Sequence, residues 1–236
     1  MNKKICFLVL LFLFFYFSTA RAFTVTTFAV SSYNTNTAIM DTTLGLTGYL
    51  IEDFENTTLV SGLSIQYGTN TPITALPRVY DINAAINMSN GEQFPNGMAN
   101  NNWDGTHALV NNVNNVFDFP FISSVSFLVA NGTKSFGIGL ANLQKSNASH
   151  DLLVNGIKIA DITSPDLPNY TDGIVRNIYL RIDALANENI FSVNILATST
   201  NEGIIYDHLA IANVPESSSL LLLGLALIFE IARRKS

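Results

Sequence analysis

The chain has 236 residues, of which only 13% are charged, and a formal net charge of -6. This length fits one domain or a small pair of domains. The acidic balance argues against a nucleic-acid partner, because phosphate backbones need basic surfaces. Because so few residues are charged, we expect Asn, Ser and Thr to make up most of the polar surface that keeps the protein soluble.

The first 22 residues have the three parts of a secretory signal peptide. Lys3-Lys4 forms a basic start, an apolar run from 5 to 17 follows, and Ala20-Arg21-Ala22 matches an A-x-A cleavage site. The only cysteine, Cys6, lies at the start of the apolar run, so the exported chain should contain no disulfide. We expect residues 1–22 to be removed.

The body of the chain, residues 23–213, begins as a series of short β-strands. Residues 23–33 are rich in β-branched and aromatic side chains, and residues 48–67 predict two strands with a turn at Asn56. Pro, Gly and Asn then interrupt the pattern from 68 to 116. This stretch predicts long connections that hide short strands, for example around His107 to Val110.

Strand patterns return at short, regular spacing in the second half. Asn155-Gly156 is the strongest hairpin signal, because both central residues of a type I′ turn need positive φ. No convincing amphipathic helix lies between the two ends of the chain. The sequence therefore predicts an all-β fold, one antiparallel β-sandwich domain of the jelly-roll type. Its expected core includes Phe121, Val125, Phe127, Phe136, Ile138, Leu140, Ile178 and Leu180.

The tail, residues 214–236, combines three features in a fixed order. The motif Val214-Pro215-Glu216-Ser217 comes first, a Leu-rich apolar run from 220 to 229 follows, and Arg233-Arg234-Lys235 lies near the end. Apolar residues enter the hydrocarbon of a membrane, and the cations remain on one side of it. We therefore expect a hydrophobic C-terminal helix at a membrane.

This tail resembles the PEP-CTERM sorting signal of Gram-negative bacteria that produce exopolysaccharide. In that signal a Pro-Glu-Pro motif precedes a transmembrane stretch and an Arg-rich end. Here Ser217 replaces the second Pro, and Glu230 interrupts the apolar run. An ordinary stop-transfer anchor is the alternative, although the apolar run is shorter than the roughly 20 residues that span a bilayer.

The resemblance implies a partner and a location. The partner is exosortase, a membrane protease that recognises such tails and cleaves them near the motif. The chain would be exported, anchored in the membrane in transit, and then delivered to the cell surface or the extracellular matrix of a Gram-negative bacterium.

No residue pattern in the body of the chain indicates an enzyme. No G-x-S-x-G motif occurs, and His107, His150 and His208 show no zinc-ligand spacing, so each is expected in a solvated loop or at a strand edge. We expect a non-enzymatic β-sandwich protein of the envelope or matrix, associated with exopolysaccharide. A carbohydrate-binding jelly roll and a secreted glycan-active enzyme are the alternatives.

Trp103 and Asp104 form the first candidate site. Trp103 is the sole tryptophan, and it lies in an Asn-rich stretch beside Asp104. A loop-borne aromatic ring among polar groups is typical of a platform on which a sugar stacks. The alternative is a loop anchor that packs on the sandwich.

Asp53, Glu55 and Asp207 form the second candidate site. Strict alternation places Asp53 and Glu55 on the face of Ile51, and it places Asp207 on the face of Ile205, where unpaired charge is disfavoured. Hard oxygen ligands from the first and last strands suit a structural Ca²⁺. The alternative is that these carboxylates are solvated or cap backbone amides, since a bulge shifts the alternation.

Overall fold

The computed structural model describes residues 22–29, 37–81, 107–115, 120–144, 149–162, 175–185, 187–198 and 203–212. The expected signal peptide before Ala22 and the tail from Val214 onward lie outside these residues. The described chain contains one helix, α2 (Thr37–Leu44). Its strands are β1 (Phe23–Ala29), β2 (Leu50–Glu52), β3 (Leu63–Tyr67), β4 (Tyr80–Asp81), β5 (His107–Val110), β6 (Ser124–Thr133), β7 (Ser135–Gln144), β8 (His150–Val154), β9 (Ile157–Asp161), β10 (Val175–Ala184), β11 (Ile190–Ala197) and β12 (Ile205–Ile211).

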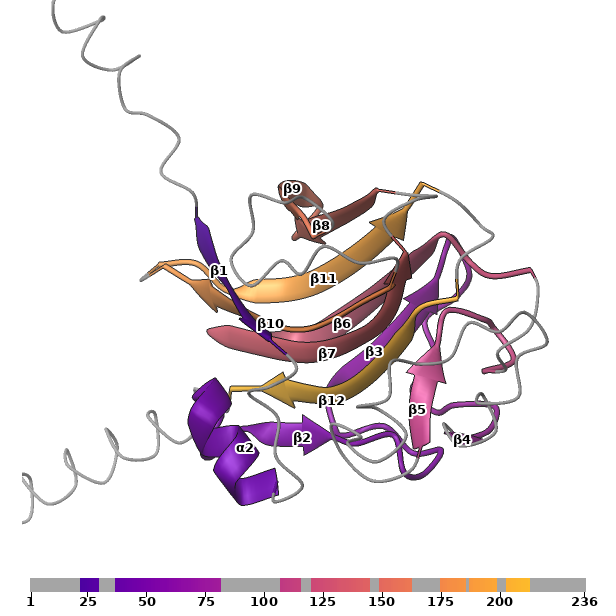
Figure 1. Ribbon diagram of the computed structural model, residues 1–236, viewed down its shortest axis with the longest axis horizontal. Helices are drawn as coiled ribbons and strands as arrows, with labels where there is room; N and C mark the ends of the chain where they lie inside the picture. Colours follow the sequence, from indigo (N-terminus) through magenta and orange to yellow (C-terminus); the bar gives the residue numbers. More distant parts are fainter. Residues whose placement is uncertain are drawn as a thin grey trace, which may run out of the picture.

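The strands form two antiparallel sheets that pack face to face (Figure 1). The seven-stranded sheet has the order β1-β10-β7-β12-β5-β4, with β2 also paired to β12, and the five-stranded sheet has the order β3-β6-β11-β8-β9. From β5 to β12 the chain changes sheet at every step except the β8–β9 hairpin. This produces β5-β12-β7-β10 opposite β6-β11-β8-β9, the strand order of a jelly roll. The predicted all-β sandwich is confirmed.

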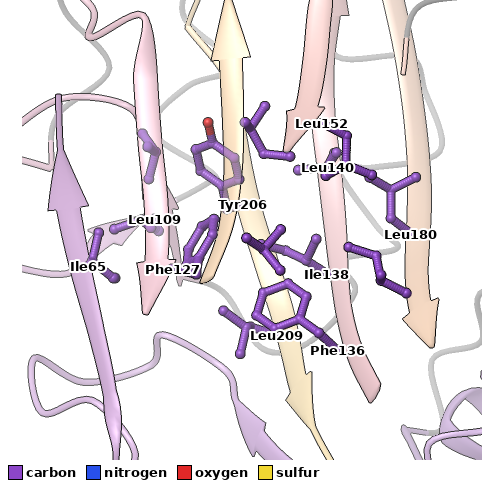
Figure 2. Close-up of a cluster of buried hydrophobic side chains, with 14 of the residues drawn as sticks. Ile65, Leu109, Phe127, Phe136, Ile138, Leu140, Leu152, Leu180, Tyr206 and Leu209 are labelled. Carbon is purple, nitrogen blue, oxygen red and sulfur yellow. The ribbon is translucent and has the colours of Figure 1, made fainter. Parts of the chain in front are cut away.

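The inner core lies between the two sheets and is built from the inward-facing side chains of most of the strands. Figure 2 shows Phe127 of the five-stranded sheet beside Tyr206 and Phe136 of the seven-stranded sheet. The ring centroids of Phe127 and Tyr206 are 5.3 Å apart in an edge-on contact, and those of Phe127 and Phe136 are 6.0 Å apart. Seven of the eight predicted core residues lie in this inner core.

A second apolar cluster covers the outer face of the seven-stranded sheet. Met40 and Leu44 of α2 pack there with Tyr179 of β10 and Ala210 of β12. The eighth predicted core residue, Phe121, is buried in this outer cluster instead of between the sheets. The helix α2 was not expected between the two ends of the chain, and packing against the sheet explains why so short a helix forms, since eight residues alone are marginal in water.

The two ends of the described chain leave from the same end of the seven-stranded sheet. Val25 of β1 pairs with Ile182, Ile182 pairs with Phe136, and Phe136 pairs with Ile211 of β12. The start of β1 and the end of β12 are therefore at the same level along the strands, with β10 and β7 between them. Both lie on the left of Figure 1. We call this end of the sandwich the exit end.

Candidate functional site

The predicted calcium ligands belong to segments that meet beside β12. β2 pairs with the second half of β12, with Glu52 opposite Leu209, and β5 pairs with the first half, with Val110 opposite Ile205. Both strands run along the same edge of β12. The residues after β2, including Asp53 and Glu55, therefore approach the start of β5 near Asp207.

Each of the three predicted ligands already accepts a hydrogen bond from nitrogen. Asp53 Oδ1 accepts from the backbone N–H of Glu55 at 3.1 Å, and Asp207 Oδ1 accepts from the backbone N–H of His208 at 2.7 Å. Glu55 contacts His107 through both oxygens, the backbone N–H at 2.7 Å and Nδ1 at 2.8 Å. Among the residues that the structure describes, no group of three acidic, His or Cys side chains is arranged to hold a metal ion.

The faces of these residues differ from the alternation that the sequence predicts. β2 ends at Glu52, so its alternation does not continue to Asp53 and Glu55. In β12 the pairing shifts between Asp207 and Ala210, and as a result Ile205 joins the outer cluster while Leu209 joins the inner core. The calcium site stays a prediction, and its ligands do not share one interior face.

His208 occupies the bulge in β12 that causes this shift. Its φ of 45° is in the left-handed region, and its side chain is buried. His208 Nε2 lies 2.7 Å from Asp41 Oδ1 on α2, and the Tyr179 hydroxyl donates to the His208 carbonyl oxygen at 3.0 Å. The bulge thus aims an imidazole at the helix and joins α2 to the sheet.

Two of the three histidines are buried, against the expectation of solvated positions. His150 in β8 and His208 in β12 are both almost fully covered, whereas His107 is half-buried beside Glu55. The sequence around His150 and His208 gives no sign of this, because burial depends on the residues that cover each strand from both faces.

Glu52 is a buried carboxyl that is not among the predicted site residues. Its Oε1 accepts from the backbone N–H of Phe54 at 2.9 Å, and its Oε2 accepts from that of Val60 at 2.7 Å. Burial raises the pKa of Glu52, because desolvation disfavours the charged form more than these two hydrogen bonds favour it. Glu52 therefore stabilises the turn in which Phe54 adopts a positive φ of 54°.

The outer face of the five-stranded sheet carries a second candidate site, which we call the polar face. The side chains that point inward are apolar, and those that alternate with them supply hydroxyl, amide and charged groups: Ser64, Gln66, Ser124, Ser126, Asp151, Lys158, Ser192 and Asn194. Leu128, Leu153 and Leu196 lie between them on this face. Mixed polar and apolar surface of this kind suits a sugar, which presents hydroxyls and apolar ring faces.

Hydrogen bonds fix the centre of the polar face. Asn194 lies opposite Ser126 on β6, and Asn194 Nδ2 donates to Ser124 Oγ at 2.8 Å and to Ser126 Oγ at 2.5 Å. On the same face, toward the β8–β9 edge of the sheet, Lys158 Nζ lies 2.6 Å from Asp151 Oδ1, and this hydrogen bond raises the pKa of Lys158. The two hydrogen bonds of Asn194 thus hold its amide against Ser124 and Ser126.

The other predicted site residues lie outside the described chain. This applies to Trp103 and Asp104, and to the sorting residues Val214-Pro215-Glu216-Ser217 and Arg233-Arg234-Lys235. Within the described ranges, no helix has the length and apolar character needed to cross a membrane.

Comparisons with known proteins leave the family of this chain open. No protein-family model matches it, and no curated protein does. Among solved structures it is similar to the catalytic unit of the thermostable GH87 alpha-1,3-glucanase from Streptomyces thermodiastaticus strain HF3-3, with 11% sequence identity and a TM-score of 0.29. The likeness covers 72% of this chain and 26% of that chain, so this chain spans about a quarter of the glucanase unit. No functional inference follows from a likeness at this level.

Proposed function

We propose that the chain is an exported, non-enzymatic jelly-roll protein of the cell surface or extracellular matrix, sorted through its tail by an exosortase-type membrane protease. The position of the fold between the two expected processing sites carries this proposal. The first strand begins at Phe23, directly after Ala20-Arg21-Ala22, and the last strand ends at Ile211, just before Val214. Removal of both ends therefore takes no strand from either sheet.

In this proposal the tail acts in export and the sandwich is the delivered product. Val214-Pro215-Glu216-Ser217 is the stretch that the protease recognises, and the apolar run from 220 to 229 holds the precursor in the membrane. Arg233-Arg234-Lys235 stays on the cytoplasmic side, where basic residues flank membrane segments.

Intact mass of the protein from its native host tests this proposal. We expect a product that begins at Phe23 and lacks residues 220–236. A Pro215→Ala, Glu216→Ala variant should keep its tail, whereas a Ser199→Ala variant, before the last strand, should be processed normally. Wild-type protein that retains the whole tail would overturn cleavage and favour a plain stop-transfer anchor.

The polar face supports a second candidate function, the binding of exopolysaccharide. Asn194 and its two serine partners offer hydrogen-bonding groups in fixed positions, which lowers the entropic cost of holding a sugar. A glycan array probed with wild type and an Asn194→Ala variant tests the site, with Thr26→Ala, an exposed change on the other sheet, as the control. Equal glycan binding by wild type and Asn194→Ala would rule out the polar face as the binding site. Release of reducing sugar would overturn the non-enzymatic assignment.

A further inference from the structure

Several connections meet at the exit end, in addition to the two chain termini. The backbone N–H of Leu185 donates to the Ala22 carbonyl oxygen at 2.9 Å, and that of Ala212 donates to the Ser135 carbonyl oxygen at 3.0 Å. Asn155, in the β8–β9 turn, donates from Nδ2 to the Asn189 carbonyl oxygen at 2.7 Å. The β6–β7, β8–β9 and β10–β11 connections therefore all lie at this end.

Exposed apolar side chains gather at the same end. Ile157 follows the β8–β9 turn, Leu185 starts the β10–β11 connection, and Phe191, the second residue of β11, lies beside Gly132 near the end of β6. Their exposed fractions are 61%, 44% and 50%. Leu50, 37% exposed and paired with Ile211, adds a fourth on the seven-stranded side. Single exposed apolar residues are ordinary, but a group at one end of a molecule indicates an interaction surface.

The chain beyond β12 points to the partner of this surface. The apolar run begins at Leu220, so only residues 213–219 separate it from Ala212. Seven residues span at most about 25 Å when fully extended. When that run is held in a membrane, the exit end must therefore lie within about 25 Å of it. A connection this short lets the exit end rest on the bilayer surface, where its exposed Leu, Ile and Phe side chains can enter the boundary between headgroups and acyl chains.

We propose that the exit end is a membrane-docking surface, through which Ile157, Leu185 and Phe191 contact the lipid headgroup region while the tail holds the precursor. This inference rests on the proposed function, because it requires the membrane-held precursor. Docking orients the sandwich with the exit end toward the lipid and the opposite end, which carries the β5–β6 connection, away from it (Figure 1).

Site-directed spin labelling tests the surface in the chain from Phe23 to Ser236, because the apolar run from 5 to 17 would itself enter vesicles. Cys6, the only cysteine, is removed with the expected signal peptide, so each introduced cysteine is the sole label site. Leu185→Cys and Phe191→Cys report on the exit end, and Val113→Cys is the matched control, since Val113 is 38% exposed and lies in the β5–β6 connection. Each labelled chain is reconstituted into vesicles of phosphatidylethanolamine with a minority of phosphatidylglycerol.

Two readings separate this inference from the proposed function. Flotation with the vesicles reports whether the tail enters the membrane, and a chain that does not float overturns the proposed function. For chains that float, the measured quantity is the ratio of the spin label's collision rate with oxygen to its collision rate with a water-soluble nickel chelate. We expect vesicles to raise this ratio several-fold at positions 185 and 191, and not at 113.

Two results would overturn the docking surface while leaving the proposed function intact. The first is water-like accessibility at all three positions in chains that float. The second is immobilisation of the labels at 185 and 191 that grows with protein concentration in the absence of vesicles, which would assign the surface to a second copy of the chain.

Discussion

Leu185 and Ala22 are joined by a backbone hydrogen bond of 2.9 Å, so the residue before the expected signal-peptide cleavage point belongs to the folded sheet. The expected cleavage is at the peptide bond between Ala22 and Phe23, and Phe23 is buried and pairs with Ala184. A protease needs its target bond in an accessible, unpaired segment. We therefore predict that processing precedes the pairing of β1 with β10, and that a folded precursor resists signal peptidase.

Incubation of the full precursor with detergent-solubilised signal peptidase measures this resistance by intact mass. Urea-unfolded precursor should be cut faster than folded precursor after both are transferred to the same buffer. Leu185→Pro, which removes the N–H donor, should speed cleavage of the folded form, while Leu185→Ala should not. Equal rates for folded and unfolded precursor would contradict the prediction.

Gly137 of β7 lies against the ring of Tyr179 on β10. A Cβ at position 137 would lie 2.3 Å from the Tyr179 hydroxyl oxygen, which donates to the His208 carbonyl oxygen. We predict that Gly137→Ala lowers the free energy of unfolding by about 1–3 kcal/mol through overpacking. Tyr179→Phe, which removes one hydrogen bond, should lower it by about 1 kcal/mol.

A double-mutant cycle measured by urea unfolding identifies the contact. Gly137→Ala combined with Tyr179→Phe should cost less than the two single changes added together, because the phenylalanine ring lacks the oxygen that clashes. Additive costs would show that Gly137 is needed for another reason.

The sequence was informative wherever one face of a strand is covered and the other is not. β6 and β11 alternate in burial along most of their length, so their patterns predicted both the strands and the inward residues Val125 and Phe127. Asn155 and Gly156 have φ of 50° and 78°, as the Asn-Gly hairpin signal predicted. These features depend on residues that are close together in the chain.

The sequence was uninformative where both faces are covered. Every residue of β12 is buried, since the inner core covers one face and the outer cluster the other, so no alternation reveals the bulge at His208. The buried role of Glu52 depends on the N–H of Val60, eight residues later. α2 likewise depends on Asp41 meeting a histidine near the other end of the chain. Such contacts arise only in the folded molecule.

The raised pKa of Glu52 predicts a pH dependence of stability with a defined sign. Between the ordinary pKa of a Glu, about 4.5, and the raised value, the native state binds more protons than the unfolded state. The contribution of Glu52 to the free energy of unfolding therefore falls as pH rises through this window. The loss is about 1.4 kcal/mol for each unit by which the pKa is raised.

Urea unfolding of wild type and Glu52→Gln across this pH range checks the sign. The stability advantage of wild type over the variant should be greatest at the acidic end, and it should shrink as pH rises. The matched control is Glu188→Gln, at an exposed carboxyl, for which the difference should change less with pH. An advantage that grows with pH would show that the two backbone hydrogen bonds outweigh burial.

A calcium ion between β2 and β12 would have to compete with the contacts that Asp53, Glu55 and Asp207 make. Glu55 in particular binds His107 through both carboxylate oxygens. A metal ion bound by Glu55 must therefore displace His107 or use the remaining lone pairs of the Glu55 oxygens. We predict that millimolar calcium raises the melting temperature of the protein above its value in EDTA. A bound ion stabilises the native state by mass action, by about 2.7 kcal/mol at a hundred times its dissociation constant.

His107→Ala, which removes the competing imidazole, should enlarge the calcium response, and Asp207→Ala should abolish it. Identical melting temperatures in both buffers, or a full response in Asp207→Ala, would dispose of the metal site and leave the three carboxylates as acceptors for their backbone and histidine N–H donors.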